Sequence, residues 1–355
     1  MKKILHIVGN RPHFIKLAML YAGLSTDDTI IQEIVHSGQH SSEEMSGVFF
    51  KELGIPQPHH YLKIDNSQGS DIFIANTSTA LQQLFQHQRN SIVFTYGDTN
   101  TTLAAAIAAK RTGIPLHHFE AGIRTGNYTM PEEINRVITD RLANVNYSCT
   151  QFNYDTLLSE GHTKSIDNKI FLTGDLMYDA YLKTKPAEII IEEKEYIACT
   201  IHRAENITNK KNLTEIVEAL NTIHKEIPVL LPLHPHTKKR MEEFNIQPRF
   251  KTLPPLGYRQ MKTFLQNCIY IITDSGGVSR EAYFSSKKSL IISPALFWPE
   301  IGMENCALNA LPQKHLIAEG FQALPNLQSN FNNNIFGDGN AAEKIHAVLK
   351  QEAAL

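Results

Sequence analysis

The chain has 355 residues, enough for two domains of ordinary size, and its composition of 42% hydrophobic and 20% charged residues is typical of a globular protein. The formal net charge of −2 excludes a general basic field of the kind that binds nucleic acid or an anionic membrane, so any phosphate binding must be local. No stretch approaches the roughly 18 apolar residues of a membrane span, and we expect a cytoplasmic protein without a membrane partner.

Strand and helix patterns alternate along the chain, which predicts a doubly wound α/β fold. Short apolar runs that end in turn residues indicate the strands, and apolar residues at helical spacing indicate the helices. In the first half we expect strands at 4–9, 30–35, 92–96, 145–149 and 170–173, with helices at 14–24, 71–87 and 101–110. In the second half we expect strands at 196–201, 229–233, 270–273 and 290–293, with helices near 212–227, 237–244, 258–266, 277–285 and 340–351.

The pattern predicts two Rossmann-like domains. The second strand–helix series begins near Asp175, so we place the first domain at residues 1–174 and the second at 175–339. Residues 340–355 predict a closing helix that packs back on the first domain. Ligands bind at the carboxyl ends of parallel strands, so we expect the polar loops of both domains to face a common cleft.

Three carboxylates lie in turns within the segment from Tyr96 to Arg136. Asp98 follows one apolar run, Glu120 follows the next, and Glu132 lies in the turn beyond. Because the carboxyl ends of parallel strands share one edge of a sheet, we expect these three side chains to converge. Carboxylates gathered near arginines are unfavourable unless a ligand or a reaction needs them, so this edge is a candidate acid/base site. The alternative is that they are helix caps and surface ion pairs.

Two regions carry groups suited to phosphate. Ser275–Gly277 follow a strand and open a helix, where backbone N–H groups and a hydroxyl can bind an anion. Arg11 lies at the exit of the first strand, where a guanidinium can grip a diphosphate, and Lys16 lies one helical turn further on. Glu281 follows the glycines by one turn and could accept hydrogen bonds from ribose hydroxyls. The alternatives are an ordinary glycine turn and solvated surface charges.

A third polar cluster, His202, Arg203 and Glu205, follows the first strand of the second domain. The 16 histidines suggest a metal hypothesis, but neither an H-E-x-x-H motif nor a C-x-x-C spacing occurs. We therefore expect neither a metal nor a cofactor. The four cysteines are far apart, mostly within or beside apolar runs, as is typical of reduced thiols in a cytosolic protein.

Eight ordered motifs resemble those of the UDP-N-acetylglucosamine 2-epimerase family. The resemblance runs from about residue 3 to residue 300 and is carried by G-N-R-P-H-F-I-K, H-S-G-Q-H, Y-G-D-T-N-T-T-L-A, F-E-A-G-I-R-T-G, P-E-E-I-N-R, T-I-H-R-A-E-N, L-P-L-H-P and T-D-S-G-G-V-x-x-E-A. The segments N-T-T-L, M-P-E-E-I-N-R-x-I-T-D-R, G-D-L-M-Y-D-A, T-I-H-R-A-E-N and E-A-Y-F are most similar to the branch that acts on UDP-2,3-diacetamido-glucuronic acid.

This resemblance implies a glycosyltransferase-B-like fold, a UDP-sugar substrate and commonly a homodimer. It also implies that carbon 2 of the sugar is inverted by elimination of UDP to a glycal and re-addition of UDP, in the synthesis of bacterial surface polysaccharide precursors. The hydrogen on carbon 2 is not acidic by itself, so departure of UDP must lead. Carboxylates then stabilise the positive ring and move the proton, while cations and a helix N-terminus hold the diphosphate.

The family's functional residues match positions in this chain. The resemblance implies that Asp98, Glu120 and Glu132 are acid/base carboxylates and that His202 is an essential histidine near the diphosphate. It implies substrate-binding roles for Arg11, Lys16, Gln39, His40, Arg136, Arg203, Ser275, Gly276, Gly277 and Glu281. Residues 253–261 match the region that holds uracil, and the second domain is therefore the expected UDP-binding domain.

One loop departs from the family pattern. After the strand at 290–292 the family usually has R-D-x-T-E-R-P-E or R-D-x-T-E-W-V-E, whereas this chain has S-P-A-L-F-W-P-E. The replacement is apolar, which predicts a differently substituted sugar or a loss of activity. The alternatives to a non-hydrolysing 2-epimerase are a hydrolysing relative that releases free sugar and UDP, a glycosyltransferase on the same fold, and a UDP-sugar binder.

Overall fold

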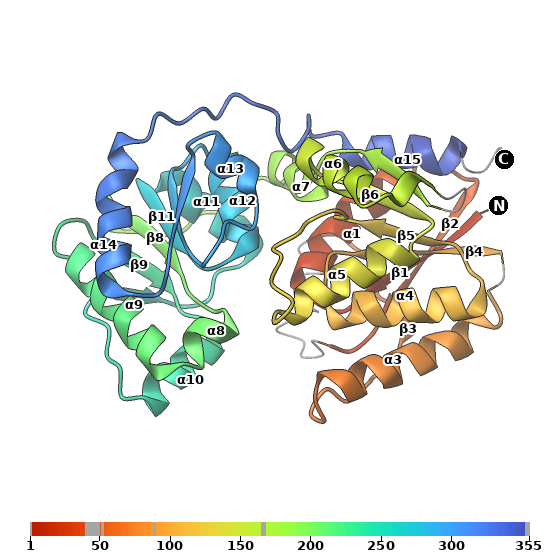
Figure 1. Ribbon diagram of the computed structural model, residues 1–355, viewed down its shortest axis with the longest axis horizontal. Coiled ribbons are helices and arrows are strands. Elements are labelled where there is room, and N and C mark those ends of the chain that lie inside the picture. The colour runs from red at the N-terminus through yellow and green to blue at the C-terminus, as the bar shows by residue number, and fades with distance from the viewer. Residues whose placement is uncertain (1, 40–49, 51–52, 89, 165–167, 352–355) are drawn as a thin grey trace. The chain divides into compact units, whose positions relative to one another are not determined.

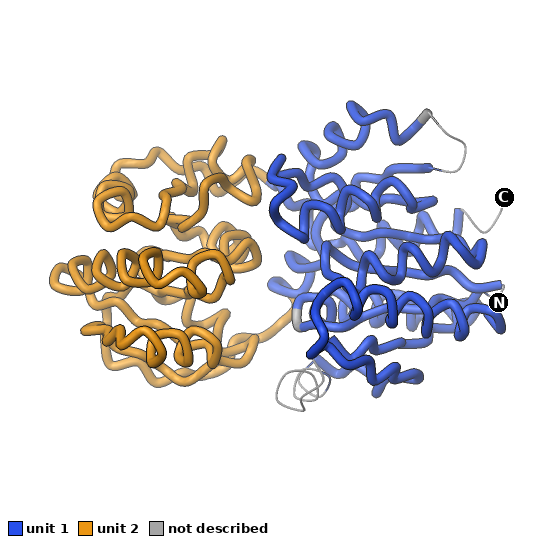
Figure 2. Tube along the Cα trace, turned by 60° about the horizontal axis from the view of Figure 1, so that its bottom comes forward, with its two compact units in different colours: residues 1–182, 334–355 blue, residues 183–333 orange. Residues whose placement is uncertain are grey.

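The computed structural model describes residues 2–39, 50, 53–88, 90–164 and 168–351, without the side chains of Arg11 and Lys164. Every strand pair within these residues is parallel, which confirms the predicted α/β class. The chain separates into two compact units, residues 1–182 with 334–355 and residues 183–333, coloured blue and orange in Figure 2. We call them unit 1 and unit 2.

Unit 1 is built on a seven-stranded sheet in the order β3-β2-β1-β4-β5-β6-β7. Its strands are β1 (Lys2–Val8), β2 (Ile30–His36), β3 (His60–Tyr61), β4 (Ser91–Tyr96), β5 (Leu116–Phe119), β6 (Val145–Ser148) and β7 (Lys169–Leu172). Its helices are α1 (Arg11–Leu24), α3 (Ser70–Phe85), α4 (Asn100–Thr112), α5 (Pro131–Leu142), α6 (Gln151–Ser159), α7 (Leu176–Lys183) and α15 (Ala341–Gln351), with a 3₁₀ turn at His162–Lys164.

Helix α4 shows how local sequence positions the candidate site. Thr99 caps its N-terminus by accepting a hydrogen bond from Thr102 N, and Gly113 ends it in a left-handed conformation with φ 72°. Its alanines are fully buried and pack with Leu5 and Val93 of the sheet, because small side chains let the helix lie close to the strands. The helix therefore begins directly after the turn that carries Asp98, and α3, α4 and α5 lie side by side (Figure 1).

The end of the chain returns to unit 1. The Asp179 carboxylate of α7 accepts hydrogen bonds from Ala341 N (3.0 Å) and Ala342 N (2.9 Å), which caps the first turn of α15. Asp175 N also donates to Phe336 O at 3.0 Å. Unit 1 thus includes α7, which was assigned to the second domain from the sequence. The last helix, α15, packs beside α1 of the same unit (Figure 1).

Unit 2 is built on a six-stranded sheet in the order β10-β9-β8-β11-β12-β13. Its strands are β8 (Ile197–Thr200), β9 (Val229–Pro232), β10 (Lys251–Leu253), β11 (Tyr270–Thr273), β12 (Ser289–Ile292) and β13 (Ala307–Ala310). Its helices are α8 (Ala204–Ile207), α9 (Lys210–Ile223), α10 (Pro235–Glu243), α11 (Tyr258–Asn267), α12 (Gly276–Phe284), α13 (Pro299–Met303) and α14 (Lys314–Ala323), with a 3₁₀ turn at Leu324–Asn326. Strands β10 and β13 were not predicted from the sequence, because edge strands are only partly buried and lack a continuous apolar run.

Among the described residues, no helix combines the length and the apolar character that a membrane crossing needs.

Unit 1 buries histidines among aromatic rings on the face of the sheet opposite α4. His6 is fully buried, with Tyr96 Oη 2.7 Å from its Nδ1 and Gln32 Oε1 3.1 Å from its Nε2. An amide oxygen can only accept, so Nε2 carries the proton and Nδ1 accepts from the tyrosine hydroxyl. Burial lowers the pKa of His6 to about 4, although the hydrogen bond to Gln32 acts to raise it. His6 is therefore neutral in the folded protein near neutral pH.

The first prediction concerns acid stability. The folded pKa of His6 lies below its unfolded value, so the unfolded state binds the proton more readily between pH 6.5 and about 4. The stabilisation is complete above that window and is lost as the pH falls through it, by about 3 kcal/mol. Urea unfolding followed by far-UV circular dichroism should show this loss in the wild type and a smaller loss in His6→Gln. An equal loss in both proteins would contradict the neutral, buried assignment.

Candidate active site

The carboxyl edge of the unit 1 sheet holds one cluster of candidate residues. Asp98 follows β4 and Glu120 follows β5 directly. Glu120 has φ 73°, a left-handed conformation that is unfavourable for a residue with a side chain and is concentrated at functional sites. Its carboxylate forms an ion pair with Lys16 of α1, which is only 2% exposed. A Cβ added at Gly97 would lie 3.4 Å from Lys16 Nζ and 3.9 Å from Glu120 Oε2, so this pair lies against the turn that carries Asp98.

Arg136 of α5 links two further carboxylates of unit 1. Its guanidinium pairs with Asp98 and, through the other terminal nitrogen, with Glu133. Burial acts to lower the pKa of Arg136, but the charges of Asp98 and Glu133 raise it. Asp98 retains 32% side-chain exposure, so this carboxylate is both paired and accessible.

Glu133 is a residue that the sequence analysis missed. It is fully buried and accepts hydrogen bonds from Thr125 N, Thr125 Oγ1 and Gly126 N at 2.9–3.1 Å. Burial acts to raise its pKa, but these hydrogen bonds and Arg136 lower it, so Glu133 is ionised. Glu132, the expected third carboxylate, is partly exposed in the first turn of α5. Arg136 follows Glu133 by three residues and Glu132 by four, and both spacings allow an ion pair on a helix, so the sequence does not distinguish the two glutamates.

Other predicted residues of unit 1 lie near the same edge. Gln39 Oε1 accepts a hydrogen bond from Thr101 Oγ1 of α4 at 2.8 Å, and the same hydroxyl lies 2.8 Å from Ser37 Oγ. Gln39 therefore contacts the helix that begins after Asp98. His40 and the side chain of Arg11 lie outside the described residues.

A separate candidate cluster lies at the carboxyl edge of the unit 2 sheet. Asp274, fully buried after β11, accepts hydrogen bonds from the backbone N–H groups of His202 and Arg203 and from the Asn206 side chain, all at 3.0–3.1 Å. These bonds hold the turn after β8 beside α12. The His202 ring is 41% exposed, and its Nδ1 lies 3.7 Å from Asp274 Oδ1.

Helix α12 begins with the predicted anion-binding residues. Ser275 is its N-cap, with Oγ accepting from Val278 N at 3.4 Å, and Gly276 and Gly277 are its first two residues. The N–H groups of a first helical turn have no partner within the helix and carry partial positive charge. This end of α12 is therefore suited to a diphosphate, and Glu281 lies on the same helix, 9% exposed.

The apolar loop after β12 packs against this helix end. Phe297 lies against Gly276, where an added Cβ would be 3.2 Å from its ring, and Trp298 Nε1 donates to Gly276 O at 3.1 Å. The Arg203 guanidinium lies 4.0 Å above the Phe297 ring centroid, and that of Arg280 lies 4.4 Å above Trp298. The loop thus packs against the first turn of α12 and contacts the guanidinium groups of Arg203 and Arg280.

Among the residues that the structure describes, no group of three or more His, Cys, Asp or Glu side chains is arranged to hold a metal ion. The candidate groups of both units are therefore carboxylates, cations, an imidazole and backbone donors.

Comparison with known proteins identifies the chain. The sequence profile of the family described as UDP-N-acetylglucosamine 2-epimerase matches residues 23–350. The UDP-2,3-diacetamido-2,3-dideoxy-D-glucuronate 2-epimerase of Pseudomonas aeruginosa is 35% identical over 98% of this chain and 99% of its own length. The UDP-N-acetylglucosamine 2-epimerase of Methanocaldococcus jannaschii is 32% identical over 98% of both chains.

Solved structures agree with these matches. The crystal structure of the M. jannaschii enzyme in complex with UDP-GlcNAc and UDP superimposes with a TM-score of 0.89 at 30% identity, covering 99% of this chain and 100% of the other. The Neisseria meningitidis enzyme bound to UDP-GlcNAc gives 0.86 at 26% identity, again covering 99% and 100%.

The two parallel α/β sheets and the matched solved structures show a glycosyltransferase-B-like fold, and the family match shows the class of a nucleotide-sugar isomerase. The chain belongs to the UDP-N-acetylglucosamine 2-epimerase family, which confirms the predicted family and enzyme class.

The second prediction tests the buried charges around Arg136. Replacement by leucine leaves Glu133 buried beside an apolar side chain, so Arg136→Leu should lower the free energy of unfolding by about 3 kcal/mol. Arg141→Leu, an exposed change on the same helix, should alter it by less than about 0.5 kcal/mol. Thermal or urea unfolding measures both. Similar small effects in the two variants would contradict a role for Arg136 in compensating Glu133.

Proposed function

We propose that the protein is a non-hydrolysing epimerase that inverts carbon 2 of a UDP-N-acetylhexosamine-type sugar, by eliminating UDP to a glycal and adding it back. The observation that carries this proposal is Glu120, held in a left-handed backbone conformation with its carboxylate paired to the buried Lys16. A strained and desolvated carboxylate next to a second one, Asp98, is suited to proton transfer. Family membership and the names of the relatives support the same reaction.

The chemistry requires two sets of groups. As the bond between carbon 1 and the phosphate oxygen breaks, positive charge develops on the sugar ring and negative charge on the departing diphosphate. Unit 1 carries Asp98 and Glu120, which can stabilise the ring and move the proton on carbon 2. Unit 2 carries the α12 N-terminus, with His202 and Arg203, which can hold the diphosphate.

The ion pairs of Glu120 with Lys16 and of Asp98 with Arg136 bear on proton transfer. An adjacent cation keeps a partly buried carboxylate ionised, so Lys16 and Arg136 maintain the bases that accept the proton. Lys16 can also donate a proton or a hydrogen bond as the charge on Glu120 changes. Glu132, at the start of α5, is the third acid/base group of the proposal.

The relatives narrow the class of substrate. Both named relatives act on UDP sugars with an acetamido group at carbon 2, one of them with a second acetamido group and a uronate. We infer a 2-acetamido UDP sugar for this chain, with UDP-2,3-diacetamido-2,3-dideoxy-glucuronate as the first to test. We also propose that the product is a precursor of a surface polysaccharide and that the enzyme is a homodimer. The four cysteines are buried, as is typical of thiols in a reducing compartment such as the cytoplasm.

The third prediction tests the reaction itself. In heavy water, the protein should place deuterium at carbon 2 of UDP-N-acetylglucosamine or of UDP-2,3-diacetamido-2,3-dideoxy-glucuronate, because the proton returned after elimination comes from solvent. Proton NMR of the recovered nucleotide sugar measures the exchange and the ratio of epimers. Free sugar in the product would favour a hydrolysing enzyme. Binding of UDP without exchange in either sugar would contradict the proposal.

The fourth prediction separates the roles of the two units. Asp98→Asn and Glu120→Gln should lower kcat by about 10²–10⁴-fold, because each removes a group that moves a proton, while UDP affinity stays within about threefold. Asp71→Asn, an exposed change in unit 1, should leave both values unchanged. Ser275→Ala should instead weaken UDP binding. A large loss of UDP affinity in Asp98→Asn would place that carboxylate at the phosphates.

A further inference from the structure

His118 of β5 is a buried histidine with an unusual pair of partners. It lies two residues before Glu120 and is fully buried. Its Nε2 is 2.7 Å from Gly97 O, and its Nδ1 is 2.6 Å from Asp140 Oδ1. A backbone carbonyl can only accept, so Nε2 carries a proton. The short contact to Asp140 places a second proton between the ring and the carboxylate.

Asp140 of α5 is held as a carboxylate by its other contacts. Its Oδ2 accepts hydrogen bonds from Gly122 N at 3.1 Å and from Arg124 Nη1 at 2.7 Å. Burial acts to raise the pKa of Asp140, but His118 and Arg124 lower it. Both partner atoms of the ring, Gly97 O and Asp140 Oδ1, are oxygens, so His118 bridges the turn before Asp98 and a buried carboxylate of α5.

The contact between His118 and Asp140 links the turns that carry the acid/base groups. Gly97 directly precedes Asp98, and Gly122 follows Glu120 by two residues. Both glycines have a left-handed backbone conformation, with φ 62° and 87°. Specific hydrogen bonds are therefore needed to hold the backbone of these two turns in place.

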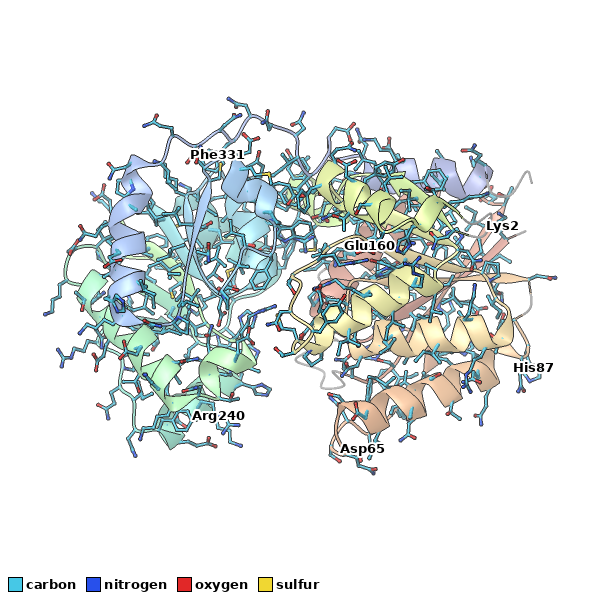
Figure 3. The ribbon with its side chains drawn as sticks, in the orientation of Figure 1. Lys2, Asp65, His87, Glu160, Arg240 and Phe331 are labelled. Atoms are coloured by element: carbon cyan, nitrogen blue, oxygen red, sulfur yellow. The ribbon has the colours of Figure 1, made fainter. Side chains whose placement is uncertain are left out.

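The same pair reaches α5 and the surface of unit 1. Asp140 lies one helical turn after Arg136, the residue that pairs with Asp98. Arg124 extends the network outward, because its Nε and Nη2 donate to the two carboxylate oxygens of Glu160 at 2.8 Å each. Glu160, labelled in Figure 3, anchors the network at the end of α6. The contact between His118 and Asp140 therefore lies between Glu160 and the turns that carry Asp98 and Glu120.

We infer that His118 is a positioning residue of the epimerase: a buried ring that, with Asp140, fixes the backbone of the turns carrying Asp98 and Glu120. The inference rests on the proposed function for its catalytic meaning. The ring acts through Gly97 O on one turn, while Asp140 acts through Gly122 N on the other. A shift of about 1 Å in such groups is enough to slow a reaction about 10²-fold.

The neighbouring His117 provides a matched control. It lies on the same strand and is 3% exposed, but its Nδ1 lies 2.9 Å from the Tyr147 hydroxyl on the opposite face of the sheet. Burial lowers the pKa of His117 to about 3, so this ring is neutral.

The test compares His118→Gln with His117→Gln. In His118→Gln we expect kcat to fall about 10²-fold while KM and the Kd of UDP stay within about threefold, because the turns shift but the groups of unit 2 are intact. In His117→Gln we expect kcat within about threefold of the wild type. A wild-type kcat in His118→Gln, or equal losses in the two variants, would overturn the inference.

A second measurement does not depend on turnover. In protein with ¹⁵N-labelled histidine, the Nε2 proton of His118 should exchange slowly with solvent deuterium, because the buried ring donates it to Gly97 O. Asp140→Asn, which keeps the ring, identifies the His118 signals by their shift. A His118 Nε2 proton that exchanges as fast as that of an exposed histidine would overturn the inference even if the protein is an active epimerase. A protected proton in a protein that places no deuterium at carbon 2 would count against the proposed function alone.

Discussion

The arrangement of unit 1 depends on carboxylates that lie at one edge of its sheet and are each paired with a cation. Glu120 pairs with Lys16, and Asp98 and Glu133 share Arg136. Removing one partner of a buried pair leaves an uncompensated charge, which is unfavourable by about 3–5 kcal/mol. The cations come from α1 and α5, so these helices must keep their positions on the sheet for the acids to stay ionised. The fold and the proposed chemistry therefore share the same contacts.

Much of this edge could be predicted from the sequence. The apolar runs before Asp98 and Glu120 predict parallel strands, and the turns after parallel strands lie at one edge of the sheet. The partners were less predictable, because Glu132 and Glu133 are adjacent on a helix and periodicity alone does not select which one faces Arg136. His118 was not predictable at all, since its role depends on Gly97 O and Asp140, which are far from it in the chain.

In unit 2 the sequence predicts the anion-binding turn but not the contacts that support it. The S-P-A-L-F-W-P-E loop differs from the family pattern, and from sequence alone it suggests only a change in polarity. The structure shows that its aromatic rings lie under Arg203 and Arg280 and against Gly276. Aromatic faces can hold a guanidinium where the usual loop offers polar side chains. In this chain the loop therefore supports the turn through aromatic contacts.

The central claim is that inversion at carbon 2 proceeds through cleavage of the bond between carbon 1 and UDP, with UDP held and then added back. Positional isotope exchange tests it most directly, with ¹⁸O in the oxygen that bridges carbon 1 and the β-phosphate of UDP-N-acetylglucosamine or UDP-2,3-diacetamido-2,3-dideoxy-glucuronate. If the bond from carbon 1 breaks and UDP is held and added back, the label should scramble into the non-bridging β-phosphate positions during epimerisation. Epimerisation with the label retained in the bridge would contradict the account.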